Sequence, residues 1–416
     1  MLKNWTQSKI LIFFSNIVLM VLSILLTLCL AEFAARHLLN PPYSDDYFEF
    51  NGTLAECDRM LGWRNKSNTV KIDETEGYVH QVVINSAGMH DREHFLKKDK
   101  DVFRILVLGD SFVEAKQVAE RESSHAVIES VLNALSDSHI RYEVISAGVY
   151  MWGTEQELMY FRTAGQFYTP DLVLVFWYAN DLADVLPDHL RACSGIACSA
   201  PYFAVCNGRF DTEPWFSVPG ISPTMGKCST AKKTLTSSLN YLYHHSHLYQ
   251  QLAPLLLKRQ SAVKLASKYS PWLENNHDEI LEYAYQVTDG ILTTLASEAN
   301  QVGAKTAVII VPPKDLVYYE VPYREQREMI EQIEIQYPDF RERLNPRLCN
   351  QKITTLMMAK SIPVLDLQPA FVKHLQTGGD ALYWDRNNHW NVRGNKMAGE
   401  LIAKWLLDNQ LVHISP

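Results

Sequence analysis

The sequence predicts an α/β fold in which helices cover both faces of a five-stranded parallel sheet. Short, continuous apolar runs bounded by glycine or polar residues are typical of strands that are buried on both faces. Helix-forming segments separate these runs, and this alternation predicts a doubly wound parallel sheet. By analogy with other such sheets, we expect the flavodoxin-like strand order 2-1-3-4-5. The predicted strands are residues 105–108, 142–146, 171–178, 307–311 and 362–367.

The N-terminal region contains the stretch Ile10–Ala31, which carries no charge over 22 positions. A stretch of this length can span a bilayer as a helix. Lys3 and Lys9 precede it, so the positive-inside rule favours a cytoplasmic N-terminus (1–9) with the remainder of the chain outside. The alternative is a cleaved signal peptide, but no small-x-small cleavage site follows directly.

The rest of the chain divides into a stalk, residues 32–77, and one large domain, residues 78–416, which starts with a strand at 78–84. Residues 185–232 interrupt the alternation with scattered proline and glycine and little periodicity, so we expect an insertion there. Apolar spacing and capping patterns predict helices over residues 123–135, 154–161, 235–258, 276–301 and 391–408.

The seven cysteines fit an oxidising compartment. Cys29 lies in the apolar stretch, and the other six are Cys57, Cys193, Cys198, Cys206, Cys228 and Cys349. Four of these fall inside the insertion, where three disulfide pairings are possible. No Cys-x-x-Cys or histidine-rich spacing indicates a metal site.

Composition narrows the class of protein. A chain of 416 residues with 47% hydrophobic content can bury a sizeable core. Its net charge of −8, without a Lys/Arg-rich stripe, argues against a nucleic-acid-binding protein.

The residues that carry chemistry follow the carboxyl ends of the predicted strands. Ser111 follows the first strand, the segment Gly148–Gly153 the second and Asn180 the third, while His389 precedes the last helix. Ligands of open α/β sheets bind at this edge. Serine hydrolysis needs a nucleophile, a histidine base, a group that orients the base, and oxyanion donors. We interpret Asp110 and Asp181 beside them as residues that brace the loops.

With these residues in these blocks, the chain resembles the SGNH (GDSL-type) hydrolases and acyltransferases. The resemblance implies that Ser111, in Gly109-Asp110-Ser111-Phe112, is the nucleophile and that its backbone amide is an oxyanion donor. It also implies that the Asn180 side chain donates to the oxyanion and that His389 is the base. No cofactor and no metal are implied.

Two departures from the family pattern bear on the mechanism. At the spacing of the family's oxyanion glycine the chain has Met151, with Gly148 before it and Gly153 after it, and all three stay candidate donors. The family's acid lies three or two residues before the histidine, where this chain has Arg386 and Asn387. The nearest carboxylate is Asp385, which we favour as the orienting acid. The alternatives are Asn387 or a backbone carbonyl, in a Ser-His dyad.

These features predict a membrane-anchored esterase or O-acyltransferase that acts outside the cytoplasm through an acyl-enzyme on Ser111. The segment Val311–Tyr318 resembles the periplasmic acetyltransferases of exopolysaccharide systems. We therefore expect O-acyl groups of glycans, or of lipids, as substrates and polysaccharide-export proteins as partners. The alternative, prompted by Met151 and the displaced acid, is a catalytically weak glycan-binding or scaffold protein.

Overall fold

The central parallel sheet has five strands in the order β7-β6-β8-β11-β12, which is 2-1-3-4-5 when these strands are numbered along the chain. The computed structural model describes residues 7–38, 48–50, 53–136, 140–186, 198, 200–216, 230–246, 248–249, 252, 270–321 and 340–412. The sheet consists of β6 (Val102–Gly109), β7 (Arg141–Gly148), β8 (Leu172–Trp177), β11 (Lys305–Ile310) and β12 (Val364–Asp366). The predicted fold class and strand order are confirmed.

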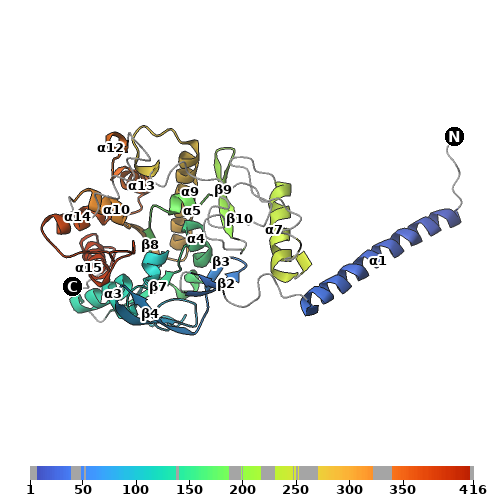
Figure 1. Cartoon of the computed structure of the whole chain (residues 1–416), viewed down its shortest axis with the longest axis horizontal. Helices are drawn as coiled ribbons and strands as arrows, with labels where there is room; N and C mark the ends of the chain where they lie inside the picture. The colour runs from blue at the N-terminus through green and yellow to red at the C-terminus, as the bar shows by residue number, and fades with distance from the viewer. Residues whose placement is uncertain are drawn as a thin grey trace.

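Helices cover both faces of this sheet (Figure 1). Successive side chains of a strand point to opposite faces, so Leu106 and Leu108 pack on one side and Ile105 and Val107 on the other. All four are fully buried, and each contributes about 1.5–3 kcal/mol of hydrophobic stabilisation. The first face is covered by α4 (Thr154–Thr163), α5 (Asp181–Asp184), α9 (Glu279–Gln301) and α13 (Leu348–Met358). The second is covered by α3 (Ser124–Leu135), α10 (Lys314–Tyr319), α14 (Gln368–Gln376) and α15 (Val392–Asp408).

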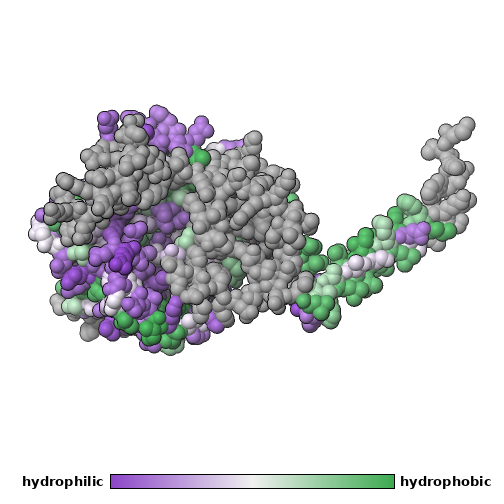
Figure 2. All heavy atoms as spheres, in the orientation of Figure 1, coloured by the Kyte–Doolittle hydropathy of each residue, from purple (hydrophilic) through white to green (hydrophobic). Residues whose placement is uncertain are grey.

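The N-terminal helix α1 (Gln7–Leu38) projects from the rest of the protein as a single rod (Figure 1). Its apolar part, Ile12–Leu38, has a mean hydropathy of 2.6, and its most apolar 18-residue window contains no buried residue. Apolar side chains line its length (Figure 2). It is long and apolar enough to cross a membrane, a property that a signal sequence shares.

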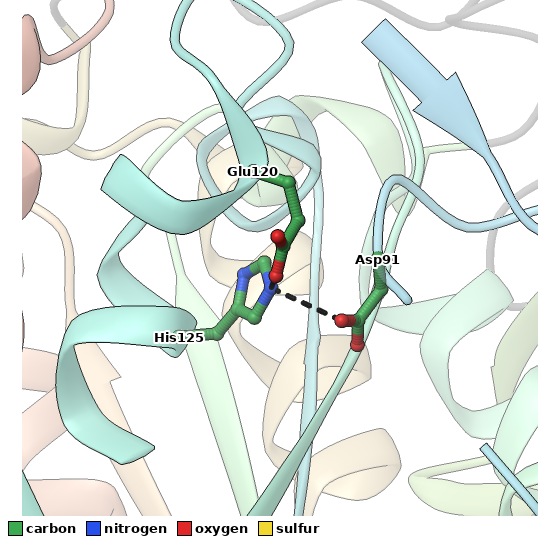
Figure 3. A group of neighbouring side chains, drawn as sticks. All are labelled: Asp91, Glu120 and His125. Carbon is green, nitrogen blue, oxygen red and sulfur yellow. Dashed lines mark ion pairs between the residues drawn. The ribbon is translucent and has the colours of Figure 1, made fainter. Parts of the chain in front are cut away.

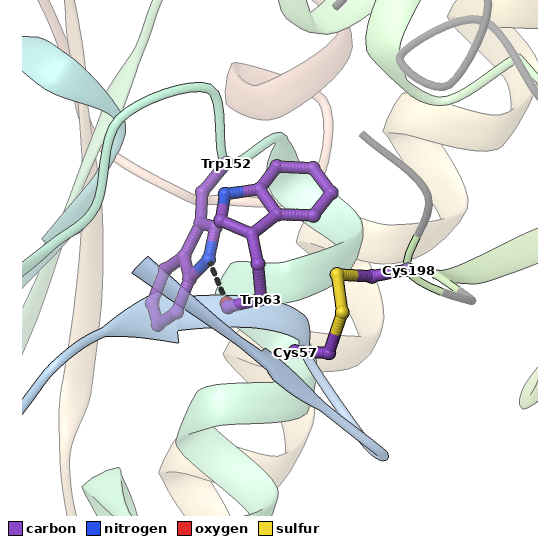
Figure 4. Close-up of a disulfide and its surroundings, with 4 residues drawn as sticks. All are labelled: Cys57, Trp63, Trp152 and Cys198. Carbon is purple, nitrogen blue, oxygen red and sulfur yellow. Dashed lines mark hydrogen bonds between the residues drawn. A yellow bond between two sulfur atoms is a disulfide. The ribbon is translucent and has the colours of Figure 1, made fainter. Parts of the chain in front are cut away.

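The predicted stalk is wrong for its second half, because residues 53–77 are folded onto the domain. A three-stranded sheet contains β1 (Phe48–Phe50), β2 (Thr53–Asp58) and β3 (Gly62–Asn65), and a hairpin contains β4 (Thr69–Thr75) and β5 (Tyr78–Ile84). Trp63 is 1% exposed and belongs to the main core. Its indole N–H donates to the Tyr150 carbonyl at 3.0 Å, and the Trp152 indole donates to the Trp63 carbonyl at 2.9 Å (Figure 4). The periodicity around Trp63 was too short to reveal this packing.

A disulfide joins this N-terminal segment to the insertion. Cys57 on β2 is bonded to Cys198, across 141 residues of sequence (Figure 4). A bridge closing a loop of that length stabilises the fold by about 5 kcal/mol in the chain-entropy model. The expectation that the four insertion cysteines pair with one another is therefore wrong for Cys198. Cys206 is disulfide-bonded, Cys349 is a buried free thiol, and Cys193 and Cys228 lie outside the described residues.

Of the predicted insertion 185–232, the structure describes residues 185–186, 198, 200–216 and 230–232. The antiparallel strands β9 (Pro201–Cys206) and β10 (Arg209–Phe216) form a ribbon. The helix α7 (Thr230–His245) covers the first part of the helix predicted at 235–258, and most of residues 247–258 lie outside the described part of the chain. The other predicted helices begin and end within three residues of those found. The remaining short elements are α2 (Ser111–Glu114), η1 (Glu120–Glu122), η2 (Gly165–Tyr168), η3 (Ser270–Trp272) and α12 (Phe340–Arg343).

Candidate active site

Ser111 lies where β6 turns directly into the short helix α2. Asp110 caps this helix by accepting the Phe112 backbone N–H at 2.9 Å. The turn needs glycine before it, because a Cβ on Gly109 would lie 2.4 Å from a Val113 methyl carbon. The sequence run Gly-Asp-Ser therefore has a local cause, and it leaves the serine at the first position of a helix at the carboxyl edge of the sheet.

The loop before α15 brings His389 to this serine. The His389 Nε2 and Ser111 Oγ atoms are 2.7 Å apart, although 278 residues separate them in sequence. The His389 ring packs near the rings of Phe112 and Tyr150, with centroid distances of 5.0 Å and 6.5 Å. Burial, and secondarily the positive charge of Lys116, lower the pKa of His389 to about 4. The imidazole is therefore neutral at pH 7, as a general base must be.

Asn387 holds the other side of the imidazole. Its Oδ1 atom lies 2.5 Å from His389 Nδ1 and also accepts the His389 backbone N–H at 3.0 Å. An amide oxygen only accepts, so Nδ1 carries the proton and Nε2 keeps its lone pair for the serine hydroxyl. Asn387 thus selects the tautomer that a triad requires. It adds no negative charge to stabilise the imidazolium that forms when the serine is deprotonated.

The prediction that Asp385 orients the base is wrong in this structure. Among the described residues, no hydrogen bond joins the Asp385 carboxylate to His389. Asp385 is exposed, and its backbone N–H donates to Glu76 at 2.8 Å. The loop closes at its base, where the Trp384 N–H donates to the His389 carbonyl at 3.1 Å. This short closure brings Asn387, two residues before the histidine, into contact with the His389 ring. Sequence offsets alone do not reveal such a turn.

The predicted oxyanion donors separate into two groups. Asn180 follows β8 at the start of α5, and its side chain is hydrogen-bonded to Asp110, which fixes it beside the serine turn. Met151 has φ +60°, in the left-handed region that favours glycine. Gly153 is ruled out as a donor because its N–H donates to Gln156 Oε1 at 2.8 Å. Gly148 is a packing residue, since a Cβ would lie 2.4 Å from the Glu114 nitrogen.

Buried carboxyl groups lie beneath these loops. Burial raises the pKa of Asp110 to about 7 and that of Glu155 to about 8, and it also raises the pKa values of Glu157, Asp181 and Asp184 well above the usual range. The carboxyls other than Asp110 are therefore mainly protonated at pH 7. The loop-bracing role expected of Asp110 and Asp181 is confirmed, because Asp181 accepts the Tyr178 N–H at 3.2 Å. Glu155 and Glu157 were not identified from sequence, where they look like ordinary polar helix positions.

A second polar group has the residue types of a metal site. Asp91, Glu120 and His125 each place one ligand atom within 4.8 Å of the others (Figure 3). However, Asp91 already accepts hydrogen bonds from the Arg92 and Ser146 backbone N–H groups. Asp91 also forms an ion pair with His94 at 3.0 Å. Burial disfavours the charged form of the His94 imidazole, but hydrogen bonds to Asp91 and Glu143 outweigh this and raise the pKa of His94 to about 9. The charge of Asp91 is thus balanced by protonated His94, and we assign this group a structural role.

Comparisons with known proteins give matches among solved structures. No family profile and no curated protein matches the chain. Among solved structures, it is similar to the acetyl xylan esterase AlAXEase, with 10% identity over 73% of this chain and 100% of that one, at a TM-score of 0.37. It is also similar to a lipase/acylhydrolase from Enterococcus faecalis (13% identity, 76% and 99% coverage, TM-score 0.36). A third is a catalytic mutant of the acetylxylan esterase Axe2 from Geobacillus stearothermophilus (13% identity, 73% and 93% coverage, TM-score 0.35).

Proposed function

We propose that this protein is a serine esterase or O-acyltransferase of the SGNH type, working through an acyl-enzyme on Ser111. The observation that carries the proposal is the continuous hydrogen-bond chain from Ser111 Oγ to His389 Nε2 and from His389 Nδ1 to Asn387. Each atom of this chain has the donor or acceptor role that nucleophile activation requires.

In the first half-reaction, His389 Nε2 takes the hydroxyl proton while Ser111 Oγ bonds to the ester carbonyl carbon. The carbonyl oxygen becomes an oxyanion, which the Asn180 side-chain amide and the backbone N–H groups of Ser111 and Met151 stabilise. The intermediate collapses by breaking the bond to the alcohol oxygen, which receives the proton from His389. In the second half-reaction, His389 deprotonates water or an acceptor hydroxyl while the oxygen of that group bonds to the acyl carbon. The bond from the acyl carbon to Ser111 Oγ then breaks, and His389 returns the proton to Oγ, which restores the enzyme.

We further propose that α1 is a retained anchor that holds the catalytic domain outside the cytoplasm. The end of α1 contacts the folded domain: Arg36 Nη2 donates to the His245 carbonyl at 2.6 Å, and Glu32 accepts from the Ser246 hydroxyl at 2.7 Å. Ala35 is 2% exposed. Contacts of this kind favour a helix that stays attached. Topology is tested with alkaline phosphatase fusions after Lys3 and after Arg36, of which we expect only the second to be active.

The proposed substrates are O-acyl groups, acetyl above all, on glycans or lipids, and the proposed partners are proteins of polysaccharide export. This choice is supported by the proposed location of the catalytic domain outside the cytoplasm and by the likeness of Val311–Tyr318 to exopolysaccharide acetyltransferases. Incubation of the acyl-enzyme with a glycan acceptor distinguishes the two reactions: a transferase acylates the glycan faster than it releases free acid.

The experiment that tests the enzyme uses the full chain in nanodiscs with p-nitrophenyl acetate and a fluorophosphonate probe. We expect product release and labelling from the native protein, and neither from Ser111→Ala. Equal release by both proteins, or absence of release and labelling in the native protein, refutes the proposal.

A second candidate is a glycan-binding or scaffold protein with weak catalysis. The specific observation in its favour is Asn387, because replacing the carboxylate of a triad by an amide lowers the rate by orders of magnitude in serine proteases. Glycan binding by Ser111→Ala at native affinity, together with a very slow native turnover, favours this candidate.

A further inference from the structure

The loop of residues 384–389 is exposed at its tip, and yet it must keep His389 in place relative to Ser111 and Asn387 relative to His389. Its base is closed by the Trp384–His389 backbone bond, and the Tyr383 hydroxyl donates to the Pro312 carbonyl at 2.7 Å. Its tip is exposed at Asp385 and Arg386. Backbone at such a position exchanges conformations readily unless other groups hold it.

Two charged side chains from distant segments bind this tip on opposite sides. Glu76 accepts the backbone N–H groups of Asp385 and Arg386 with its two carboxylate oxygens, at 2.8 Å and 2.6 Å. Lys314 Nζ donates to the carbonyls of Trp384 and Asp385, each at 2.7 Å. Two successive peptide units therefore each have their N–H on Glu76 and their C=O on Lys314. The negative and positive charges both complement the peptide dipoles, as charge-assisted hydrogen bonds do.

Lys314 is placed for this task. It is the first residue of α10, follows β11 and Pro312-Pro313, and is only 8% exposed. Burying an ammonium group is unfavourable unless its donors are satisfied. The two loop carbonyls satisfy two of its three donors.

Glu76 occupies a position that its own backbone disfavours. Thr75 pairs with Tyr78, so Glu76 and Gly77 form a two-residue hairpin turn, with φ of +51° and +85°. This turn type favours asparagine, aspartate or glycine at its first central position. A glutamate there is explained by what its longer side chain contacts, which is the loop of residues 384–389.

We propose that Glu76 and Lys314 are positioning residues that hold the Asp385–Asn387 segment and thereby set the Asn387–His389 contact. The proposal deepens the function proposed above and rests on it. It also means that the hairpin β4–β5, at the N-terminal end of the domain, is part of the active-site architecture.

The test uses Glu76→Asn, because asparagine suits the turn but is too short to make both bonds. In full-length protein in nanodiscs, hydrogen exchange measured on peptides covering residues 383–390 should be at least tenfold faster at the Asp385 and Arg386 amides. The turnover kcat on p-nitrophenyl acetate should fall about tenfold with KM changed less than twofold. The thermal unfolding midpoint should stay the same or rise.

Lys314→Met should give the same loss of kcat, and Lys314→Arg should restore part of it because arginine also donates to two carbonyls. The matched controls are Glu74→Gln, on the exposed face of the same hairpin, and Lys305→Met, at the exposed start of β11; neither should change exchange or kcat. Unchanged exchange in Glu76→Asn overturns the proposal, and so does a kcat loss explained by a lower unfolding midpoint. If the native protein has no esterase activity, the proposed function fails, while the exchange measurement still tests the positioning role.

Discussion

Replacing Asn387 by aspartate should raise the pKa of His389 and make it a stronger general base. The two side chains have the same shape, so the 2.5 Å contact with His389 Nδ1 can be kept while a neutral acceptor becomes a charged one. His389 has a pKa of about 4, lowered by burial and by Lys116. Among the described residues, no carboxylate is hydrogen-bonded to the ring to oppose these two effects. A carboxylate at position 387 supplies the missing charge.

The size of the effect follows from Coulomb's law. A unit negative charge about 4 Å from the imidazolium centre, at an effective dielectric constant of about 20, stabilises it by about 4 kcal/mol. Desolvation of the new carboxylate, which replaces a half-buried amide, offsets roughly half of this and leaves about 2 kcal/mol. That amounts to about 1.5 pKa units for His389 and a rate about 30-fold higher.

The assay is kcat/KM for p-nitrophenyl acetate between pH 3 and pH 9. In the native protein the rate should rise with pH through an inflection near the His389 pKa of about 4. In Asn387→Asp the inflection should move to about 5.5 and the plateau should rise about 30-fold. Asp385→Asn is the matched control and should change the rate less than twofold. An unchanged plateau in Asn387→Asp, or a large loss in Asp385→Asn, refutes this account of the base.

Three further predictions concern charge and stability. Lys116→Met should raise the pH-rate inflection, because the Lys116 charge is the second cause, after burial, of the low His389 pKa; a lower inflection would contradict this. Glu155→Gln should stabilise the protein at pH 8 but not at pH 4, as measured by urea unfolding. Burial raises the pKa of Glu155 from 4.5 to about 8, so the glutamate lowers stability progressively as pH rises through that window; equal effects at both pH values would exclude this cause. Cys57→Ser with Cys198→Ser should lower the free energy of unfolding by about 2–5 kcal/mol, and reduction of the double variant should then have less effect than reduction of the native protein.

Local patterns were sufficient for much of the fold. Apolar runs such as 105–108 identify buried strands because only a strand covered on both faces is apolar at every position. The sequence was sufficient to predict that Ser111, Asn180 and His389 lie close together, because the carboxyl ends of parallel strands share one edge of the sheet. The helix starts were predictable where capping residues mark them, although α4 uses Gly153 with Gln156 rather than Thr154 as its cap.

The features decided by tertiary structure depend on the closure of individual loops and on contacts between segments far apart in the chain. Asn387, and not Asp385, meets the imidazole because the loop closes between Trp384 and His389 and its tip is held by Glu76 and Lys314. Cys57 pairs with Cys198 because β2 folds back onto the insertion. The sequence by itself determined the strands, since these follow from periodicity, and it indicated Ser111 and His389 as the proposed nucleophile and base through their positions and the family resemblance. The contacts between individual atoms within the loops were set by loop closure and by packing between segments 70 to 309 residues apart, which no local pattern encodes.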